Sequence, residues 1–313
     1  MVVGAGLLVL AAGRLGGAFP LLDMANLAAL PAALLVVLGS LSLMVRRRTT
    51  SARVIGACGL VLGLLATLPA GAVPSRCAPS APRLRVAWIN AHGPVAPEPI
   101  ASWVAQEHPQ ILGFAELEKS SKDMRAMMAE RFAHHRSCLP NGRCSTMLFT
   151  HIAPSEAESL AHGDPENRRA LSAVRMGFAD GGALGSFSVI ALHLSHPLPL
   201  GRQQEELLEA QAALADPANA IVMGDFNLSP RMWTLRDFAA RNGLTVTRAS
   251  RPTWPASWNG MTNPGLWQID HLLVGRNWQV ESLRVSPDLG SDHRGYVADL
   301  CRPDTGPVPA GQS

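Results

Sequence analysis

The sequence predicts an α/β sandwich of two sheets flanked by helices, preceded by N-terminal transmembrane helices. Residues before about position 75 are mostly Ala, Leu, Val and Gly, whereas charged residues have ordinary density afterwards. In the later part, strand and helix patterns first alternate, and strands then follow one another as hairpins, which is typical of two sheets with helices packed outside them. We therefore expect a membrane anchor over residues 1–74, a linker over 75–83, a folded domain over 84–303 and a disordered tail over 304–313.

Two uncharged runs of twenty residues, Asn26–Val45 and Val54–Val73, are long enough to cross the hydrocarbon core as helices. The loop between them contains four arginines, which the positive-inside rule keeps in the cytoplasm. The second run then leads outward, so we expect an inner-membrane protein whose folded domain is periplasmic or extracellular. Val2–Leu22, interrupted by Arg14, is either a further span or a membrane-surface segment. A cleaved signal peptide is the alternative, but it does not explain two full-length runs.

Charge and cysteine content bear on nucleic-acid binding and on disulfide formation. Residues 1–81 carry six arginines and one aspartate, whereas the remainder carries 21 basic and 23 acidic residues, so the domain has no basic surplus that would favour nucleic acid. Cys138 and Cys144 flank a turn-prone segment and could form a disulfide in an oxidising compartment. Cys77 and Cys301, at the two ends of the domain, are a second candidate pair.

The first half of the domain alternates strands with helices. Leu84–Asn90 alternates in polarity between prolines, and Ile111–Ala115 is an apolar run with the length of a buried strand. Helical spacing predicts helices over Pro99–Glu107 and Lys119–Ala133, and the methionines of the second are interpreted as core residues.

The second half is richer in paired strands. Ala179-Asp-Gly-Gly182 is a hairpin signal between two predicted strands. Strands are expected at Ser145–Thr150, Ala170–Phe178, Ser186–Leu194, Ala220–Met223, Gln268–Val274, Val280–Val285 and Gly295–Leu300. Helices are expected at Gln203–Leu214 and Met232–Arg241.

Polar and acidic side chains lie at the end of one predicted strand after another, or close to it. These residues are Asn90, Glu116, His193, Asp225, Asn227, Asp270, Asp292 and His293. Strand ends that converge on one sheet edge make a site. The set contains carboxylates, amides and histidines but no cysteine, and such hard oxygen ligands favour magnesium, with manganese or calcium as alternatives, over zinc.

Four motifs in this order carry a family resemblance: Ile111-Leu-Gly-Phe-Ala-Glu116, Ala191-Leu-His193, Met223-Gly-Asp-Phe-Asn227 and Ser291-Asp-His293. Over Leu84–Arg302 the chain resembles the endonuclease/exonuclease/phosphatase superfamily, which includes deoxyribonuclease-like enzymes, and the preceding helices resemble a bacterial membrane-anchored subset of it. The resemblance implies a four-layer α/β/β/α sandwich of two mixed sheets, and a catalytic role for the domain.

The resemblance also implies roles for individual residues. Glu116, Asn90 and Asp292 are the expected metal ligands. Asp270 and His293 are the expected orienting carboxylate and general base, and Asp225 is expected to orient the attacking water. Asn227 and His193 are expected to be catalytic and to bind the phosphate.

Other polar residues have competing interpretations. Arg202 is a candidate phosphate contact, and a solvated helix residue is the alternative. His271 should face the opposite side of its strand from Asp270. His196 is interpreted as a neighbour of the site, either a bystander or a substrate contact. Trp254 is interpreted as a packing residue. The family usually has Gln where this chain has Ala115, and His92 occupies a place where some nucleases have an acidic residue.

We therefore expect a membrane-anchored, divalent-metal-dependent phosphoesterase that uses a His–Asp pair to activate water. Its substrate would be a phosphate ester, either nucleic acid or phospholipid, and its other partner the membrane. A non-catalytic, membrane-tethered binding protein is the alternative from another class. The sequence specifies neither the substrate nor the oligomeric state.

Overall fold

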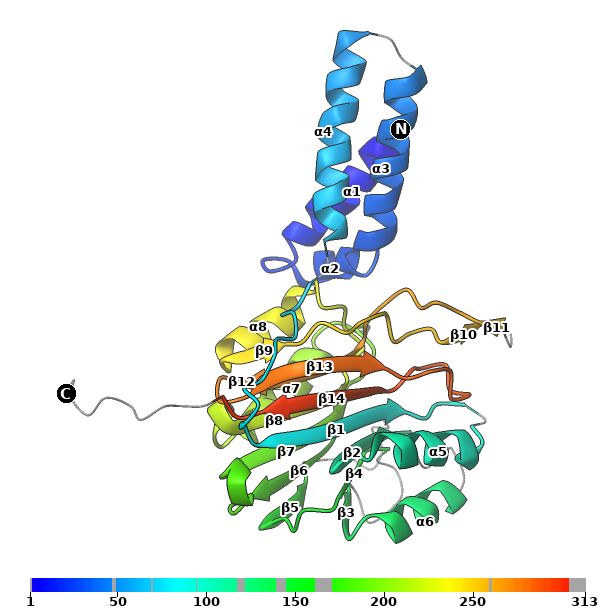
Figure 1. Ribbon diagram of the computed structural model, residues 1–313. Coiled ribbons are helices and arrows are strands. Elements are labelled where there is room, and N and C mark those ends of the chain that lie inside the picture. The colour runs from blue at the N-terminus through cyan, green and yellow to red at the C-terminus, as the bar shows by residue number, and fades with distance from the viewer. Residues whose placement is uncertain are drawn as a thin grey trace, which may run out of the picture.

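A pair of long helices stands off a β-rich domain in the computed structural model of the chain (Figure 1). The structure describes residues 2–46, 49–68, 70–93, 95–116, 122–138, 145–160, 171–258 and 261–303, without the side chains of residues 122 and 258. The pair consists of α3 (Ala29–Arg46) and α4 (Thr50–Thr67), and the shorter α1 (Val2–Arg14) packs against α3. The short α2 (Pro20–Asp23) and a single 3-10 turn (Met24–Asn26) lie at the base of the pair.

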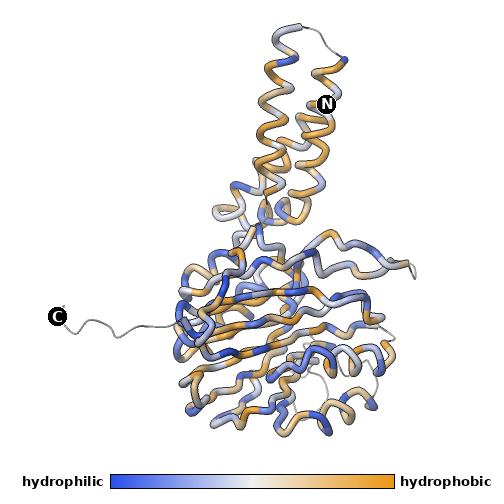
Figure 2. The backbone as a smooth tube through the Cα atoms, viewed as in Figure 1, coloured by the Kyte–Doolittle hydropathy of each residue, from blue (hydrophilic) through white to orange (hydrophobic). Residues whose placement is uncertain are grey.

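Helices α3 and α4 are long and apolar enough to cross a membrane (Figure 2). Each has 18 residues, which corresponds to about 27 Å of helix at a rise of roughly 1.5 Å per residue. Helix α1 has 13 residues and is shorter than a usual span. Length and composition are the evidence for membrane insertion here, and a signal sequence can satisfy the same two criteria.

The first of two six-stranded sheets has the order β13-β14-β1-β2-β4-β3. Strands β1 and β2 run parallel, and the other neighbours are antiparallel. Helices α5 and α6 cover its outer face through a cluster of buried apolar side chains. The bounds are β1 Arg83–Asn90, α5 Pro97–Glu107, β2 Ile111–Ala115, α6 Lys122–Arg131, β3 His134–Ser137, β4 Met147–Thr150, β13 Gln279–Val285 and β14 Tyr296–Cys301.

The second sheet has the order β5-β6-β7-β8-β12-β9, and helices α7 and α8 pack on its outer face. Only β7 and β8 run parallel among its described pairs. The bounds are β5 Glu156–Ser159, β6 Ser172–Phe178, β7 Phe187–His193, α7 Arg202–Ala212, β8 Ala220–Asp225, α8 Trp233–Arg241, β9 Leu244–Val246 and β12 Asp270–Gly275. A two-stranded hairpin, β10 (Ser257–Trp258) and β11 (Met261–Thr262), lies beside the sandwich. Short 3-10 turns lie at Gly182–Leu184 and Pro217–Asn219.

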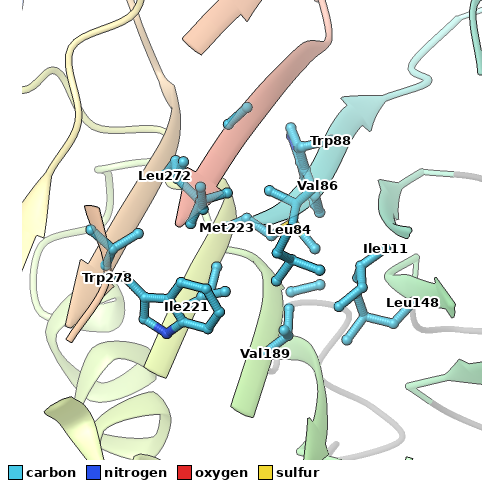
Figure 3. Packing of buried hydrophobic residues seen from close by; sticks show 14 of the residues in the cluster. Leu84, Val86, Trp88, Ile111, Leu148, Val189, Ile221, Met223, Leu272 and Trp278 are labelled. Atoms are coloured by element: carbon cyan, nitrogen blue, oxygen red, sulfur yellow. The ribbon is translucent and has the colours of Figure 1, made fainter. Parts of the chain in front are cut away.

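The core between the two sheets is apolar (Figure 3). Leu84, Val86 and Trp88 of β1 meet side chains such as Val189 of β7 and Met223 of β8. Alternate residues of each strand point into this layer, as the two-residue period of a strand requires. The arrangement of two mixed sheets between helix layers confirms the predicted fold class.

Strands β3, β5 and β9 were not predicted from the sequence. Each forms an edge of its sheet, and the first two, His134–Ser137 and Glu156–Ser159, carry few apolar side chains. An edge strand can be held by backbone hydrogen bonds to one neighbouring strand without burying many side chains. Such a strand therefore needs little of the alternation of apolar and polar residues by which buried strands are recognised. The hairpin predicted between β6 and β7 is present.

One disulfide joins the segment before β1 to the last strand. Cys77 is bonded to Cys301 across 224 positions of sequence, so this candidate pairing from the sequence is present. The alternative pairing of Cys138 involves Cys144, which lies outside the described residues.

The N-terminal segment from α1 to the 3-10 turn at Met24–Asn26 docks on helix α8 through a buried carboxylate. Asp23, only 2% exposed, accepts hydrogen bonds from the backbone N–H groups of Trp233 at 2.8 Å and Thr234 at 3.0 Å and from the Thr234 hydroxyl at 2.9 Å. Helix α8 receives no capping bond from the side chain of its own N-cap residue, Met232. Asp23 therefore caps a helix 210 residues away, where the N-terminal N–H groups favour a negative charge.

We expect Asp23→Ala to lower the free energy of unfolding by about 1–3 kcal/mol, because it leaves the first N–H groups of α8 without a buried acceptor. Chemical denaturation of the full chain in detergent measures this loss. Asp180→Ala is the matched control, because exposed Asp180 accepts a single turn N–H from Gly182; we expect it to cost less than about 0.5 kcal/mol. Equal losses in the two variants would contradict the capping role.

Candidate active site

Strand pairing brings the predicted site residues to one end of the sandwich. In the first sheet Asn90 pairs with Ala115, the residue before Glu116. In the second sheet Asp225 lies between His193 of β7 and Asp270 of β12. Because these pairs sit at the ends of β1, β2, β7 and β8 and at the start of β12, polar side chains from both sheets meet there.

A buried histidine–aspartate pair forms the centre of this cluster. The His293 Nδ1 atom lies 3.0 Å from Asp270 Oδ2, and the two residues are 6% and 1% exposed. The other carboxylate oxygen of Asp270 accepts a 2.9 Å hydrogen bond from the indole N–H of Trp88. The carboxylate is thus held from two sides, which fixes the orientation of the imidazole ring.

Asp225 connects this pair to the rest of the cluster. Its Oδ2 atom lies 3.7 Å from Nε2 of both His293 and His193 and accepts a 3.0 Å hydrogen bond from the Asn90 side chain. Its Oδ1 atom accepts the backbone N–H of Asn227 at 2.9 Å. One carboxylate therefore contacts groups from both sheets.

Position 224, just before Asp225, requires glycine for a steric reason. A Cβ atom on Gly224 would lie 2.1 Å from the backbone oxygen of Leu192 on the adjacent strand β7. Only glycine lets β8 approach β7 this closely, and this approach sets the distance between Asp225 and His193.

Glu116 is a second carboxylate near His193, in addition to Asp225. Its Oε1 atom is 4.0 Å from His193 Nε2, and its Oε2 atom is 2.8 Å from His92 Nδ1. The His92 backbone N–H donates to Asn90 Oδ1 at 3.0 Å, so His92 bridges two of the predicted metal ligands. The His193 Nδ1 atom contacts the Ser145 hydroxyl at 3.2 Å.

Two site residues have left-handed backbone conformations, Glu116 with φ 57° and Asn227 with φ 52°. This region is unfavourable for residues other than glycine, and such strain of about 1–3 kcal/mol is typically found at functional sites. The Asn227 side chain donates to the Leu194 carbonyl at 2.8 Å.

Two predicted residues lie further from the centre. Asp292 Oδ2 accepts the indole N–H of Trp254 at 3.3 Å, and the Trp254 ring centroid is 6.5 Å from that of His293. Arg202 begins helix α7, where its charge acts on Glu206.

The donor set fits a divalent cation bound through oxygen. Asp292 Oδ1 is buried and has no hydrogen-bond partner within the described part of the chain, and a buried carboxylate oxygen requires a counter-charge. The side chains of Glu116 and Asn90 contain further oxygens that remain candidate ligands. The ligand atoms of Asp225, Asp270 and His293 also lie within 4.8 Å of one another. However, His293 and Trp88 already occupy the oxygens of Asp270, so we favour the side of the cluster that contains Glu116.

The pKa values follow from burial and from these contacts. Burial alone would lower the pKa of His293, but the charges of Asp270 and Asp225 outweigh it and raise the pKa to about 10. Burial opposes ionisation of Asp270, yet the charge of His293 and hydrogen bonds from His293, Thr253 and Trp88 lower its pKa. Burial and the charge of Asp270 raise the pKa of Asp225.

The structure also reveals contacts that the sequence reasoning missed. Trp88 lies two residues before Asn90, so the two-residue period of the strand could have placed it on the same face as Asn90. Gly113 on the neighbouring strand leaves room for the Trp88 ring, because a Cβ atom there would lie 2.7 Å from it. Trp254 contacts Asp292 in addition to packing on Trp267. His271 lies away from the cluster, with Nε2 2.7 Å from the Leu228 carbonyl, and burial lowers its pKa to about 4.

Comparison with known proteins agrees with this geometry. The sequence profile of the Endonuclease/Exonuclease/phosphatase family matches residues 87–293, which confirms the predicted resemblance. No curated protein matches the chain.

Three similar solved structures show the same fold. An endonuclease/exonuclease/phosphatase from Beutenbergia cavernae is 20% identical, with a TM-score of 0.56 over 71% of this chain and 72% of the other. D. rerio TDP2 complexed with single strand DNA product is 16% identical, with a TM-score of 0.51 over 70% and 98%. Beta toxin from Staphylococcus aureus with bound magnesium ions is 12% identical, with a TM-score of 0.53 over 69% and 99%.

We expect His293 to stay protonated far above neutral pH in the metal-free protein and Asp270→Asn to lower its pKa. The folded pKa of about 10 exceeds the usual 6.5, so the resulting stabilisation is present below about pH 6.5 and is lost as pH rises through 10. Histidine NMR titration in EDTA measures both pKa values. Neutral His271 provides an internal control that the variant is folded, and a wild-type His293 that titrates near 6.5 would contradict the expectation.

Proposed function

Since the chain belongs to the endonuclease/exonuclease/phosphatase family, whose members are metal-dependent phosphoric ester hydrolases, we propose that it is a membrane-anchored phosphoesterase in which His293 and Asp270 activate water. The observation that carries this proposal is the buried His293–Asp270 pair with its free Nε2 atom 3.7 Å from Asp225. An imidazole that is held at Nδ1 and faces a carboxylate at Nε2 can exchange a proton with a water between them.

The residues would divide the reaction as follows. Asp225 orients the attacking water, and His293 takes its proton at Nε2 while Asp270 stabilises the resulting imidazolium. His193 and Asn227 donate hydrogen bonds to the phosphate oxygens, and each such donor typically contributes about 3 kcal/mol to lowering the barrier. Attack in line cleaves a P–O bond, and the leaving oxygen takes up a proton.

Glu116, Asn90 and Asp292 would hold the divalent ion, with magnesium favoured. When bound, the ion neutralises charge on the phosphate oxygens and adds positive charge that lowers the pKa of nearby groups. His293 needs such a change, because a pKa of about 10 keeps it protonated, and unable to act as a base, in the metal-free site.

Three features support anchoring with the domain outside the cytoplasm. Helices α3 and α4 have the length and composition of spans. Arg46 is the last residue of α3 and Arg53 lies in the first turns of α4, so the ends of both helices at the short connection are basic, and such short basic connections stay in the cytoplasm. The Cys77–Cys301 disulfide at the domain ends is typical of an oxidising compartment. We therefore propose residues 1–74 as the anchor, 75–83 as the linker and 84–303 as the catalytic domain.

The substrate we favour is a phospholipid, with nucleic acid as the alternative within the same chemistry. Tethering places the site beside a bilayer, and 21 basic against 23 acidic residues after position 81 give the domain no electrostatic attraction for DNA. The TDP2 structure complexed with single strand DNA product supports the alternative. A non-catalytic, membrane-tethered binding protein is the candidate from another class.

We expect the full chain to hydrolyse a phosphate ester with magnesium and to lose activity in EDTA. His293→Ala should lower the rate by about 10²–10⁴-fold, because it removes the proton acceptor. His196→Ala is the matched control, since His196 is an exposed histidine near the end of β7. Phospholipid head-group release and nicking of supercoiled DNA, measured side by side, distinguish the substrates. Equal activity of His293→Ala and His196→Ala would contradict the mechanism, and no hydrolysis of any ester would favour the binding protein.

We expect a cysteine introduced at Ser51 to be shielded in intact spheroplasts and one at Arg276 to react with a membrane-impermeant maleimide. Ser51 lies near the arginine-rich end of the helix pair, and exposed Arg276 follows β12. Both variants carry Cys58→Ser, which removes the one free cysteine among the described residues. Permeabilised cells, in which both positions should react, are the control. The reverse labelling pattern would contradict the proposed orientation.

A further inference from the structure

A pocket of about 710 Å³ lies where the membrane-side segment meets helices α7 and α8. Its apolar wall includes Leu15, Pro20, Leu207, Leu208 and Phe238. This volume is within the range of about 300–1,000 Å³ typical of ligand sites. The residues that line the pocket do not include any of the proposed catalytic or metal-binding residues, so it is a separate site.

The wall on the membrane side is held firmly in place. Asp23 caps α8 as described above, and the Gly13 carbonyl accepts the indole N–H of Trp233 at 3.0 Å. A Cβ atom on Gly16 would lie 2.8 Å from the Trp233 ring, so glycine allows the segment after α1 to lie directly against α8. The pocket is therefore formed by packed, hydrogen-bonded elements of the fold.

Positive charge accumulates at this pocket. Arg14 and Arg241 line it together with Asp237, and Arg241 is paired with Asp237 at 2.8 Å. Half-buried Arg231 lies two residues before the lining residue Trp233. Burial lowers the pKa of Arg231, and the like charge of Arg14 lowers it further. An anion bound beside Arg14 would relieve this repulsion.

The pocket lies at the junction between the helix pair and the β-rich domain. It borders α2 and α8, at the end of the helix pair next to the domain (Figure 1), and Arg46 lies at the other end of the pair. If α3 and α4 cross the inner membrane, the pocket opens at the surface of that membrane that faces away from the cytoplasm. There the available ligands combine long apolar chains with a phosphate group.

We propose that this pocket binds a phospholipid of the surrounding bilayer, with its acyl region against the leucine-rich wall and its phosphate beside Arg14. The inference rests on the proposed membrane placement and is independent of the hydrolytic reaction. A lipid in this position would hold the anchor and the catalytic domain together at the membrane surface.

Native mass spectrometry of the full chain, purified in mild detergent from membranes of known phospholipid composition, tests the proposal. We expect the wild type to retain one phospholipid and Leu208→Asp to reduce the retained fraction about tenfold, because the new carboxylate removes apolar wall and repels phosphate. Leu208 is 60% exposed, so the change should leave folding intact. Leu200→Asp, at a 44% exposed leucine outside the pocket, is the matched control.

A second pair separates the phosphate contact from the apolar wall. Arg14→Gln should reduce retention, whereas Arg276→Gln, at an exposed arginine outside the pocket, should not. Equal retention by Leu208→Asp and Leu200→Asp at unchanged melting temperature would overturn the proposal, as would a membrane-inserted wild type without bound lipid. Release of the chain from membranes by alkaline carbonate would overturn the membrane placement and this inference with it. Retained lipid in a chain that hydrolyses no ester would uphold the inference and refute the proposed reaction.

Discussion

The burial of His293 between Asp270 and Asp225 is the constraint on which the catalytic domain depends. All three residues are almost completely buried, and removing one partner of a buried ion pair typically costs about 3–5 kcal/mol. The antiparallel pairing of β8 with β12 sets Asp225 opposite Asp270, and a single imidazole reaches both carboxylates. A shift of this register by one residue would turn one carboxylate to the other face of the sheet.

The sequence predicted the buried strands and most of the cluster because both depend on local signals. Apolar runs of strand length ended in polar residues, and such ends meet wherever strands share a sheet edge. The edge strand β5 was missed because its side chains, from Glu156 to Ser159, are mostly polar. The Asp23 cap was missed for another reason. Its partner lies 210 residues away, and no local pattern reveals a helix cap supplied from such a distance.

That cap makes the N-terminal helical segment part of the domain's structure. Asn26 donates to Asp23 at 2.9 Å and to the end of α1 at 3.0 Å, so one small network ties α1, α2 and α8 together. Further along the chain, Ala72 pairs with Thr247, the residue after strand β9, through backbone bonds with Val246 and Arg248. The N-terminal segment thus contacts the domain at several separate places, including a hydrogen bond from the Trp267 indole to the Leu27 carbonyl, which favours a fixed orientation of the site relative to the helix pair.

Charge balance in the site also argues for a bound cation. The cluster brings Glu116, Asp225 and Asp270 together near the imidazole of His293, with Asp292 further from its centre, and His293 is an imidazolium at neutral pH because its pKa is about 10. The excess negative charge would repel a phosphate ester, which is itself an anion. It also stabilises the proton on His293, which the proposed mechanism requires to be removed before His293 can act as a base. A divalent cation among these carboxylates relieves both problems, since it attracts the phosphate and lowers the proton affinity of His293. The acidic, oxygen-rich composition of the site is therefore consistent with phosphate chemistry only when such an ion is part of the site.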